Sequence, residues 1–268
     1  MIELERSAAA HWRGTQEQWL GEWLLRAADG FTGRANSALA LGDPGVSLDA
    51  ALDYVTGWYR ARGLPAMIAV PLPLAADGRD GRDGRDGQDG QDGLDAELTE
   101  RAWETRPGPA FVMVADLPLA VADLPLAATG SGLPAGAEVA AVADPDAAWL
   151  ARYHYRGTDT QPPVMREVLT SAQDQAFISI RTESEVLAIA RLSIADGWAG
   201  LTAVEVNPDH RRAGLGLAIT AAACAEAVRR DVGRVFLQVE VGNAAARALY
   251  ERCGFRYSHR YHYRMAPG

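Results

Sequence analysis

The sequence predicts an α/β protein with a mixed sheet, and three observations lead to that prediction. Segments with strand alternation and segments with helical spacing follow one another along most of the 268 residues. A strand, a glycine-containing loop, a helix and a second strand follow in order over Val204–Val241, which is the pattern of a parallel β-α-β crossover. A similar order of elements occurs in the first half of the chain, so two domains of related topology are expected.

The C-terminal half has the clearer pattern. DPDAAWLARYHY and PPVMREVLTSA are predicted helices, followed by two alternating strands joined through a TESE turn. GWAGLTAVEV is a third strand, which Pro208 ends, and LAITAAACAEAVRR is an Ala-rich helix. After a strand over Arg234–Val241 comes a helix with Asn243 as its N-cap and Gly254 as its end. The alternating strand FRYSHRYHYRM completes the order, with its tyrosines expected on one face and its arginines on the other.

The N-terminal half shows a similar succession with a weaker pattern. EWLLRAA and ANSALAL are predicted strands, and SLDAALDYVTGWYRARG is a helix that Ser47 caps and Gly63 ends. PAMIAVPLP is a buried strand, LDAELTERAWETR a helix and AFVMVAD a further strand. This order mirrors the C-terminal half from Leu201 onward, which predicts a second copy of the same topology.

Two stretches interrupt this pattern. Residues 77–95 repeat Gly-Arg-Asp and Gly-Gln-Asp triplets with one apolar residue, Leu94, and are expected to form a disordered loop. The heptapeptide VADLPLA occurs twice in tandem over 114–127, and a Gly/Pro/Ala-rich segment follows it. We interpret the second stretch as a linker, which predicts an N-terminal domain over 1–130 and a C-terminal domain over 138–268.

Composition excludes several classes of protein. The formal net charge of −9 argues against broad nucleic-acid binding, so any anion site must be local. All 26 basic residues are arginine, which removes lysine as a nucleophile. The chain has no run of 18 apolar residues and no signal-peptide core at its start, so neither a membrane nor export is expected. Cys224 and Cys253 have no metal-binding spacing and are expected to be free, buried thiols of a cytoplasmic protein.

The loop RRAGLG, Arg211–Gly216, lies where a strand passes into the Ala-rich helix. Backbone N–H groups at a helix N-terminus converge on one spot and, with roughly half a positive charge from the helix dipole, can bind phosphate. Arg211 and Arg212 add charge, while Gly214 and Gly216 allow an anion to approach the backbone. The loop matches neither the Walker nor the Rossmann fingerprint. Taken alone, it is either a phosphate cradle or a plain connection.

With a second motif, the loop resembles a known family. VEVNPDHRRAGLG carries a Q/R-x-x-G-x-G/A loop, and NAAARALYERCGF carries an N…A…LYE…GF signature in which Asn243 and Tyr250 share one helix face. At these residues the chain resembles the GCN5-related N-acetyltransferase (GNAT) superfamily, from roughly Glu138 to its end. The resemblance implies the acyl-CoA N-acyltransferase fold, acetyl-coenzyme A (acetyl-CoA) as cosubstrate and no metal.

The resemblance also implies roles for the matching residues. The loop amides would hold the pyrophosphate, and the preceding strand would pair with the pantetheine arm as with an added strand. Asn243 would contact the pantetheine region while capping its helix, and Tyr250 would stand near the sulfur as general acid. The cofactor-binding residues expected on this basis are Val204, Glu205, Val206, Arg211, Arg212, Ala213, Gly214, Leu215, Gly216, Leu217, Asn243 and Tyr250.

The general base is less clearly indicated. Some relatives carry a Glu where this chain has Gln238, and an amide cannot accept the proton. Glu205, at the strand end beside the expected thioester, is the predicted base. Glu240 lies two residues beyond Gln238 on the same strand face, and a base acting through ordered water is a further alternative. The histidines expected to be surface or strand residues are His154, His210, His259 and His262.

These features predict an N-acetyltransferase in which a primary amine of a small molecule or peptide attacks acetyl-CoA directly. One alternative is a CoA-binding sensor without turnover, which Gln238 keeps open. Another is an enzyme like mycothiol synthase, which is a tandem acetyltransferase. The acceptor and the oligomeric state, monomer or homodimer, are not indicated. The RYHYR strand is either a solvated edge strand or part of a site for an acidic or aromatic acceptor.

The N-terminal copy is expected to be degenerate. LALGDPGVS stands at its loop position, lacks RxxGxG and places Asp43 where an anion would bind. GFTGRANS, Gly30–Ser37, is either a tight hairpin or a contribution to the acceptor cleft. A tandem GNAT with a structural N-terminal repeat is therefore expected.

Overall fold

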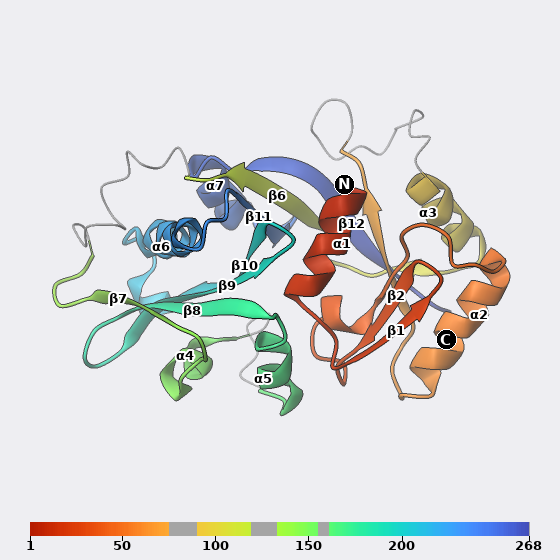
Figure 1. The fold of residues 1–268 in the computed structure, drawn as a ribbon, viewed down its shortest axis with the longest axis horizontal. Coiled ribbons are helices and arrows are strands. Elements are labelled where there is room, and N and C mark those ends of the chain that lie inside the picture. Colours follow the sequence, from red (N-terminus) through yellow and green to blue (C-terminus); the bar gives the residue numbers. More distant parts are fainter. Residues whose placement is uncertain (75–89, 119–132, 155–160, 268) are drawn as a thin grey trace.

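The computed structural model describes residues 1–74, 90–118, 133–154 and 161–267. These residues form one twelve-stranded mixed sheet with helices packed on it, as the predicted α/β class requires (Figure 1). Most of the 77–95 repeat and the second VADLPLA copy lie outside the described residues. The N-terminal elements are α1 Ile2–His11, β1 Gln16–Leu20, β2 Trp23–Ala27, η1 Arg34–Asn36, β3 Ala38–Leu39, α2 Leu48–Arg60, β4 Met67–Leu72, α3 Gly90–Glu100, β5 Glu104–Thr105 and β6 Ala110–Asp116.

The C-terminal elements follow the predicted order, with one addition. They are β7 Glu138–Val142, α4 Ala147–Arg152, α5 Val164–Leu169, β8 Asp174–Arg181, β9 Val186–Ala195, β10 Trp198–Val206, η4 Pro208–His210, α6 Leu215–Arg229, β11 Arg234–Glu240, α7 Ala244–Arg252 and β12 Arg256–Met265. The addition is β7, an edge strand that pairs antiparallel with β8.

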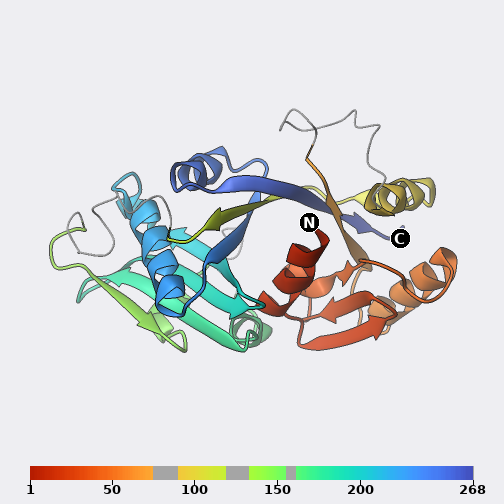
Figure 2. The same cartoon turned by 45° about the horizontal axis from the view of Figure 1, so that its top comes forward.

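The two halves of the chain exchange their last strands. The sheet order is β1-β2-β3-β4-β12-β6-β11-β10-β9-β8-β7, so C-terminal β12 pairs with β4 of the N-terminal half. Conversely, β6 of the N-terminal half pairs antiparallel with β11. Figure 2 shows β12 running from beside α7 across to the N-terminal half, with β6 alongside it. Each half therefore completes the sheet of the other.

Both halves contain a parallel crossover, as the mirrored order of elements predicted. In the C-terminal half, β10 and β11 are parallel and α6 connects them. In the N-terminal half, β3 and β4 are parallel and α2 connects them. The Ser47 cap of α2 is confirmed, because its hydroxyl accepts the Ala50 N–H at 3.4 Å.

Each half has its own apolar core, and α1 lies between them (Figures 1 and 2). The C-terminal core packs α6 and α7 against β8–β11, and it includes both free cysteines, Cys224 and Cys253. The N-terminal core packs α2 and α3 against β2–β4. In the part of the chain that is described, no helix has the length and apolar character needed to cross a bilayer.

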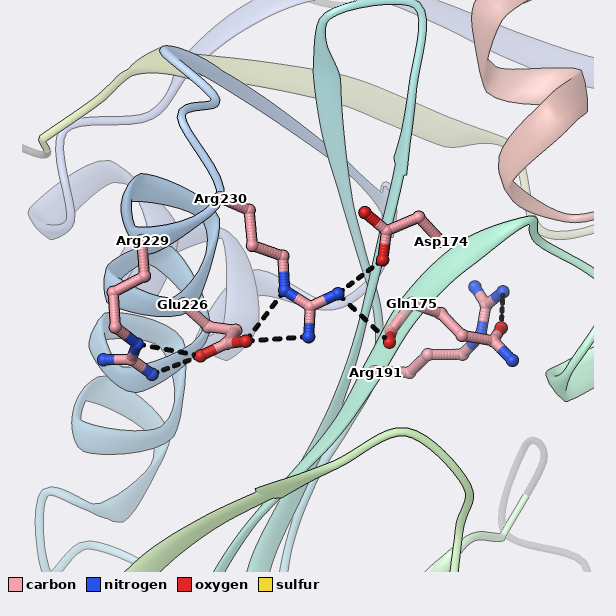
Figure 3. Close-up of polar contacts among 6 residues, drawn as sticks. All are labelled: Asp174, Gln175, Arg191, Glu226, Arg229 and Arg230. Atoms are coloured by element: carbon pink, nitrogen blue, oxygen red, sulfur yellow. Dashed lines mark hydrogen bonds and ion pairs between the residues drawn. The ribbon is translucent and has the colours of Figure 1, made fainter.

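Ion pairs fasten the C-terminal end of α6 to the sheet (Figure 3). Glu226 accepts hydrogen bonds from Arg229 and Arg230, and Arg230 also pairs with Asp174 on β8. Burial opposes ionisation of Glu226, but the hydrogen bonds from the two arginines outweigh burial, so the pKa of Glu226 is lowered. The helix that follows the glycine loop is therefore fixed at its far end.

Three sequence expectations are corrected here. Helix α3 begins at Gly90, so the end of the 77–95 segment is not disordered; Asp95 pairs there with Arg264 and His262 of β12. The predicted strand ANSALAL contains only the two-residue β3, because Arg34–Asn36 form a 3₁₀ turn.

The third correction concerns β12, which is an interior strand and not a solvated edge. A bulge between Tyr257 and His259 breaks its alternation, so Tyr257 lies on the opposite face from Tyr261 and Tyr263. Tyr257 packs on the C-terminal core, while Tyr261 and Tyr263 belong to the cluster at the junction of the two halves. The tyrosines of this strand therefore serve two different environments.

Candidate functional site

The RRAGLG loop is a sharp turn that opens directly into α6. Arg212 and Gly214 have positive φ angles of 64° and 79°, and helix α6 begins at Leu215. Gly214 is the N-cap residue and offers no side-chain acceptor, so the first-turn amides that lack intrahelical partners face outward. This is the geometry that binds an anion at a helix N-terminus.

Gly216 also meets a packing requirement that the sequence did not indicate. A Cβ at this position would lie 3.1 Å from Leu249 Cδ2 and 3.9 Å from Val206 Cγ2. The missing side chain therefore lets α6 approach α7. Residues of the loop and Asn243 and Tyr250 of α7 line one cleft, which is described next.

A large cleft follows the loop, and we call it the cofactor cleft. Its volume is about 990 Å³, which suits a ligand larger than most metabolites. Of the predicted cofactor residues, Ala213 and Glu205 do not line it, although Glu205 lines a neighbouring cleft. The predicted residues that do line it are Val204, Val206, Arg211, Arg212, Gly214, Leu215, Gly216, Leu217, Asn243 and Tyr250.

The parallel strands β10 and β11 separate beside this cleft. They pair only from Ala199–Leu201 to Val235–Leu237, although both strands continue further. Beyond that point β10 has a bulge over Thr202–Glu205, and Ala203 there has a φ of 51°. Among the described strands none pairs with the β11-facing edge of β10 after Leu201, so this edge can accept an extended ligand.

Asn243 and Tyr250 lie on α7, at the seam between two clefts. Asn243 caps the helix, since its Oδ1 accepts the Ala246 N–H at 3.0 Å, as predicted. Tyr250 is 7% exposed, and burial raises its pKa well above the usual value. The hydroxyl is therefore protonated at neutral pH, which a general acid requires. Both residues line the cofactor cleft and the neighbouring one.

The neighbouring cleft, which we call the acceptor cleft, lies between the two halves of the chain. Its volume is about 300 Å³. Thr32, Gly33 and Arg34 contribute to it from the N-terminal half, so the GFTGRANS segment contributes to a cleft, which was one of its two interpretations. Asn36 holds this segment in shape, because its side chain accepts the Ala28 and Gly30 N–H groups at 2.8 and 2.9 Å.

Glu205, the predicted base, lies in this acceptor cleft with a partner that the sequence did not indicate. Its carboxylate accepts the backbone N–H of His154 at 2.9 Å and lies 2.7 Å from His154 Nδ1. His154 also lines the cleft. Nothing in the local sequence relates residues that are so far apart in the chain.

The alternative base positions lie on β11. Glu240 and Gln238 line the acceptor cleft, and the Gln238 side chain accepts the Tyr261 hydroxyl at 3.4 Å. The other three histidines expected at surface or strand positions are engaged elsewhere: His259 with Glu5, His262 with Asp95 and His210 with Glu185. In the described ranges no cluster of His, Cys, Asp and Glu could hold a metal ion.

Comparison with known proteins covers almost the whole chain. Residues 1–89 and 95–264 match the model of the family described as "Probable histone acetyltransferase Rv0428c C-terminal". The chain is 28% identical to "Probable histone acetyltransferase Rv0428c" of Mycobacterium tuberculosis, over 98% of this chain and 72% of that protein. It is 25% identical to "Uncharacterized N-acetyltransferase YobR" of Bacillus subtilis, over 98% of this chain and 97% of that protein.

Two solved structures share the fold. One is a GCN5-related N-acetyltransferase from Kribbella flavida, with a TM-score of 0.62, 20% identity, and coverage of 95% of this chain and 90% of that one. The other is a tandem GNAT protein from the clavulanic acid biosynthesis pathway, with a TM-score of 0.64, 14% identity, and coverage of 87% and 76%. Their likeness confirms the predicted acyltransferase fold and its tandem arrangement.

Proposed function

The chain belongs to the GCN5-related N-acetyltransferases, in the family named above, and from this premise we propose that it acetylates a primary amine by direct attack on acetyl-CoA. The observation that carries this proposal is the position of Tyr250, a buried, neutral acid at the seam of the cofactor and acceptor clefts. A group at that seam can reach both a cofactor sulfur and an incoming amine.

The residues present fit the cosubstrate. The uncapped first turn of α6 offers amide donors to a pyrophosphate, with Arg211 and Arg212 beside it. The unpaired edge of β10 over Val204–Val206 offers main-chain groups to a pantetheine amide. Asn243 keeps its side-chain NH₂ for the same ligand, since only its oxygen is used by the cap.

The proposed chemistry uses three groups of this chain. Acetyl-CoA supplies the acetyl thioester, and main-chain N–H groups at the end of β10 polarise its carbonyl. Glu205 takes a proton from the acceptor ammonium, and His154 fixes the position of the Glu205 carboxylate. Tyr250 donates its proton to the departing thiolate. The three groups lie around one cleft, so one bound pair of substrates can reach all of them.

The N-terminal half, which we propose to end near residue 130, shapes the acceptor cleft. Its loop position is occupied by its own side chain, since Asp43 Oδ1 accepts the Gly45 N–H at 2.7 Å. A carboxylate at that amide repels a phosphate, which supports a single cofactor site per chain. The C-terminal half, from about residue 138, would hold the cofactor.

A CoA-binding sensor is the second candidate, because Gln238 replaces the carboxylate that some relatives have on this strand. The two candidates agree on cofactor binding and differ on turnover. Calorimetric titration with acetyl-CoA tests what they share. We expect saturable binding by the wild type and a loss of about tenfold or more in Gly214→Glu, because the added carboxylate would face the phosphates.

A matched variant controls for the substitution itself. Gly57→Glu places the same side chain on α2, where no atom lies within 4 Å of the added Cβ. This variant should bind acetyl-CoA like the wild type. If the wild type did not bind, or if both variants bound equally well, the loop would not be the phosphate site.

A further inference from the structure

The acceptor cleft has two chemically different ends. At one end it shares Val204, Asn243 and Tyr250 with the cofactor cleft. Glu205, which also lines the acceptor cleft, directly follows Val204 in the chain. At the other end it shares Arg34 and Tyr263 with a small cavity under α1. The carboxylates of Glu205 and Glu240 line the acceptor cleft but not that small cavity. Glu205, next to Val204, therefore places negative charge toward the cofactor cleft, and Arg34 places a cation at the opposite end.

Arg34 is the cation that this end presents to the cleft. Its guanidinium stacks over Trp12, with 4.8 Å from Cζ to the ring centroid, and Trp12 also lines the cleft. In the described part of the chain, no acidic side chain lies within ion-pair distance of Arg34. Glu5 lines the adjoining cavity, but it is paired with His259 at 2.7 Å.

Two other cations near Arg34, namely Arg191 and Arg26, also have no acidic partner within the ranges that the structure describes. Arg191 is fully buried, and its hydrogen-bond acceptors are neutral: the carbonyl oxygens of Leu169 and His11 and the side chains of Gln175 and Thr202. Burial, and then repulsion from Arg34, lower the pKa of Arg191 to about 9. Arg26, which is also buried, bonds to the carbonyl and hydroxyl oxygens of Ser37. An anion beside Arg34 would relieve this excess of positive charge.

The Arg34 end of the cleft is aromatic, because Trp12, Tyr261 and Tyr263 line both the cleft and the small cavity beside it. Trp12, Tyr153, Tyr261 and Tyr263 line the cleft, with Tyr261 and Tyr263 in edge-to-face contact at 5.5 Å. A volume of about 300 Å³ is at the lower limit for small-molecule sites. The cleft is thus suited to a compact body that carries opposite charges.

From this arrangement, and resting on the proposed acetyl transfer, we infer that the acceptor is a small primary amine that also bears a carboxylate. The amine lies between Glu205 and Tyr250, the body packs on the aromatic side chains, and Arg34 receives the carboxylate. Transfer forms the amide N–C bond, breaks the C–S bond, and leaves the carboxylate unchanged. A lysine-rich peptide, in contrast, would bring further positive charge toward Arg34.

Matched acceptors separate this inference from the proposed function. Benzylamine and para-(aminomethyl)benzoate differ only in a carboxylate at the far end of the ring. With saturating acetyl-CoA, we expect the wild type to prefer the benzoate by about 10- to 100-fold in kcat/KM, as a hydrogen-bonded charge pair allows. Arg34→Gln should remove most of this preference, and Arg34→Lys should keep part of it.

Arg62→Gln is the matched control, because Arg62 likewise stacks on a tryptophan, Trp58 at 3.6 Å, but lies outside the cleft. It should keep the full preference. Equal use of the two amines by the wild type, better use of a lysine-rich peptide, or an unchanged preference in Arg34→Gln would each overturn the inference. Benzylamine turnover without a preference would leave the proposed acetyl transfer intact.

A binding measurement covers the case in which no amine is turned over. Benzoate is titrated calorimetrically into the wild type and Arg34→Gln in the presence of CoA. Tighter binding of benzoate by the wild type, by about tenfold or more, supports the carboxylate site even without turnover. Equal or undetectable binding in both overturns it, while acetyl-CoA binding reports separately on the cofactor cleft.

Discussion

At the scale of single residues, Tyr250 carries the strongest mechanistic expectation. The residue is 7% exposed, and burial raises the pKa of its hydroxyl, which is therefore neutral. Tyr250→Phe removes the proton donor and keeps the ring that contacts Phe255. We expect turnover to fall about 10²- to 10⁴-fold while acetyl-CoA binding changes little. A steady-state assay beside calorimetry measures both, and full activity in this variant would exclude Tyr250 as the acid.

Glu205 is the residue on which the proposed proton transfer depends. Glu205→Gln keeps a hydrogen-bond acceptor for the His154 N–H but cannot take a proton. We expect kcat/KM to fall by about 100-fold or more, with the binding of acetyl-CoA retained. Glu240→Gln is the matched control on the facing strand, since Glu240 lines the same cleft. A larger loss in the control than in Glu205→Gln would assign the base to Glu240.

His11 links stability to pH. Burial, and then the charge of Arg191, lower its pKa from 6.5 to about 4, so the folded protein holds this imidazole neutral. Below pH 6.5 the unfolded chain binds the proton more readily. Stability is therefore complete above pH 6.5 and is lost as the pH falls toward 4, by about 3 kcal/mol from this residue.

The variant His11→Gln tests this pH dependence, because glutamine can bond to Ser193 as Nδ1 of His11 does at 2.9 Å but does not titrate. Urea unfolding at several pH values between 6.5 and 4 gives the slope of stability against pH. The slope should be smaller in the variant than in the wild type. Equal slopes would mean that other groups account for the acid sensitivity.

At the scale of elements, α6 is fixed at both ends by different means. Its first turn packs on α7 through Gly216, and its last turn is tied to β8 through Glu226, Arg230 and Asp174 (Figure 3). Glu226→Ala should lower the free energy of unfolding by about 1–3 kcal/mol, because two arginines lose a largely buried acceptor. Denaturant unfolding measures this loss. Glu183→Ala, at an exposed turn, should be neutral, and an equal effect of both would argue against the network.

The elements that sequence patterns predicted are those whose buried faces are apolar. The helices α2 and α6 and the strand β11 bury mainly apolar side chains, and the two functional motifs lie at the start of α6 and on α7. Helix α1 was missed because several of its buried residues are polar, Glu5, Ser7 and His11 among them. Strand β7 was missed because it is an exposed edge, with no alternation to recognise.

The acceptor cleft could not be predicted from local patterns. It joins Trp12, Arg34 and His154 to Glu205 and Tyr263, which are far apart in the chain. Their proximity depends on the exchange of β6 and β12 between the halves. Each half alone would satisfy the predicted topology without that exchange, because hydrophobic periodicity does not specify which strands pair across two domains.

At the scale of the whole molecule, the exchanged strands should make folding a single event. β12 hydrogen-bonds to β4 and β6, and β6 to β11, so neither core can open without breaking strands of the other half. Val55→Ala in the N-terminal core and Val235→Ala in the C-terminal core each remove fully buried methyl groups. Each should destabilise the protein by roughly 2 kcal/mol.

Hydrogen exchange of the slowest amides then distinguishes one folding unit from two. If the halves unfold together, each variant should speed exchange in α2 and in β11 alike, by about 30-fold for the expected loss. Val46→Ala, at a site that is 47% exposed, should change neither element. If each core variant affected only its own half, the two halves would open independently. The acceptor cleft between the halves could then widen while the C-terminal half that forms the cofactor cleft stays folded. In that case the 300 Å³ volume of the acceptor cleft would no longer limit the size of the amine.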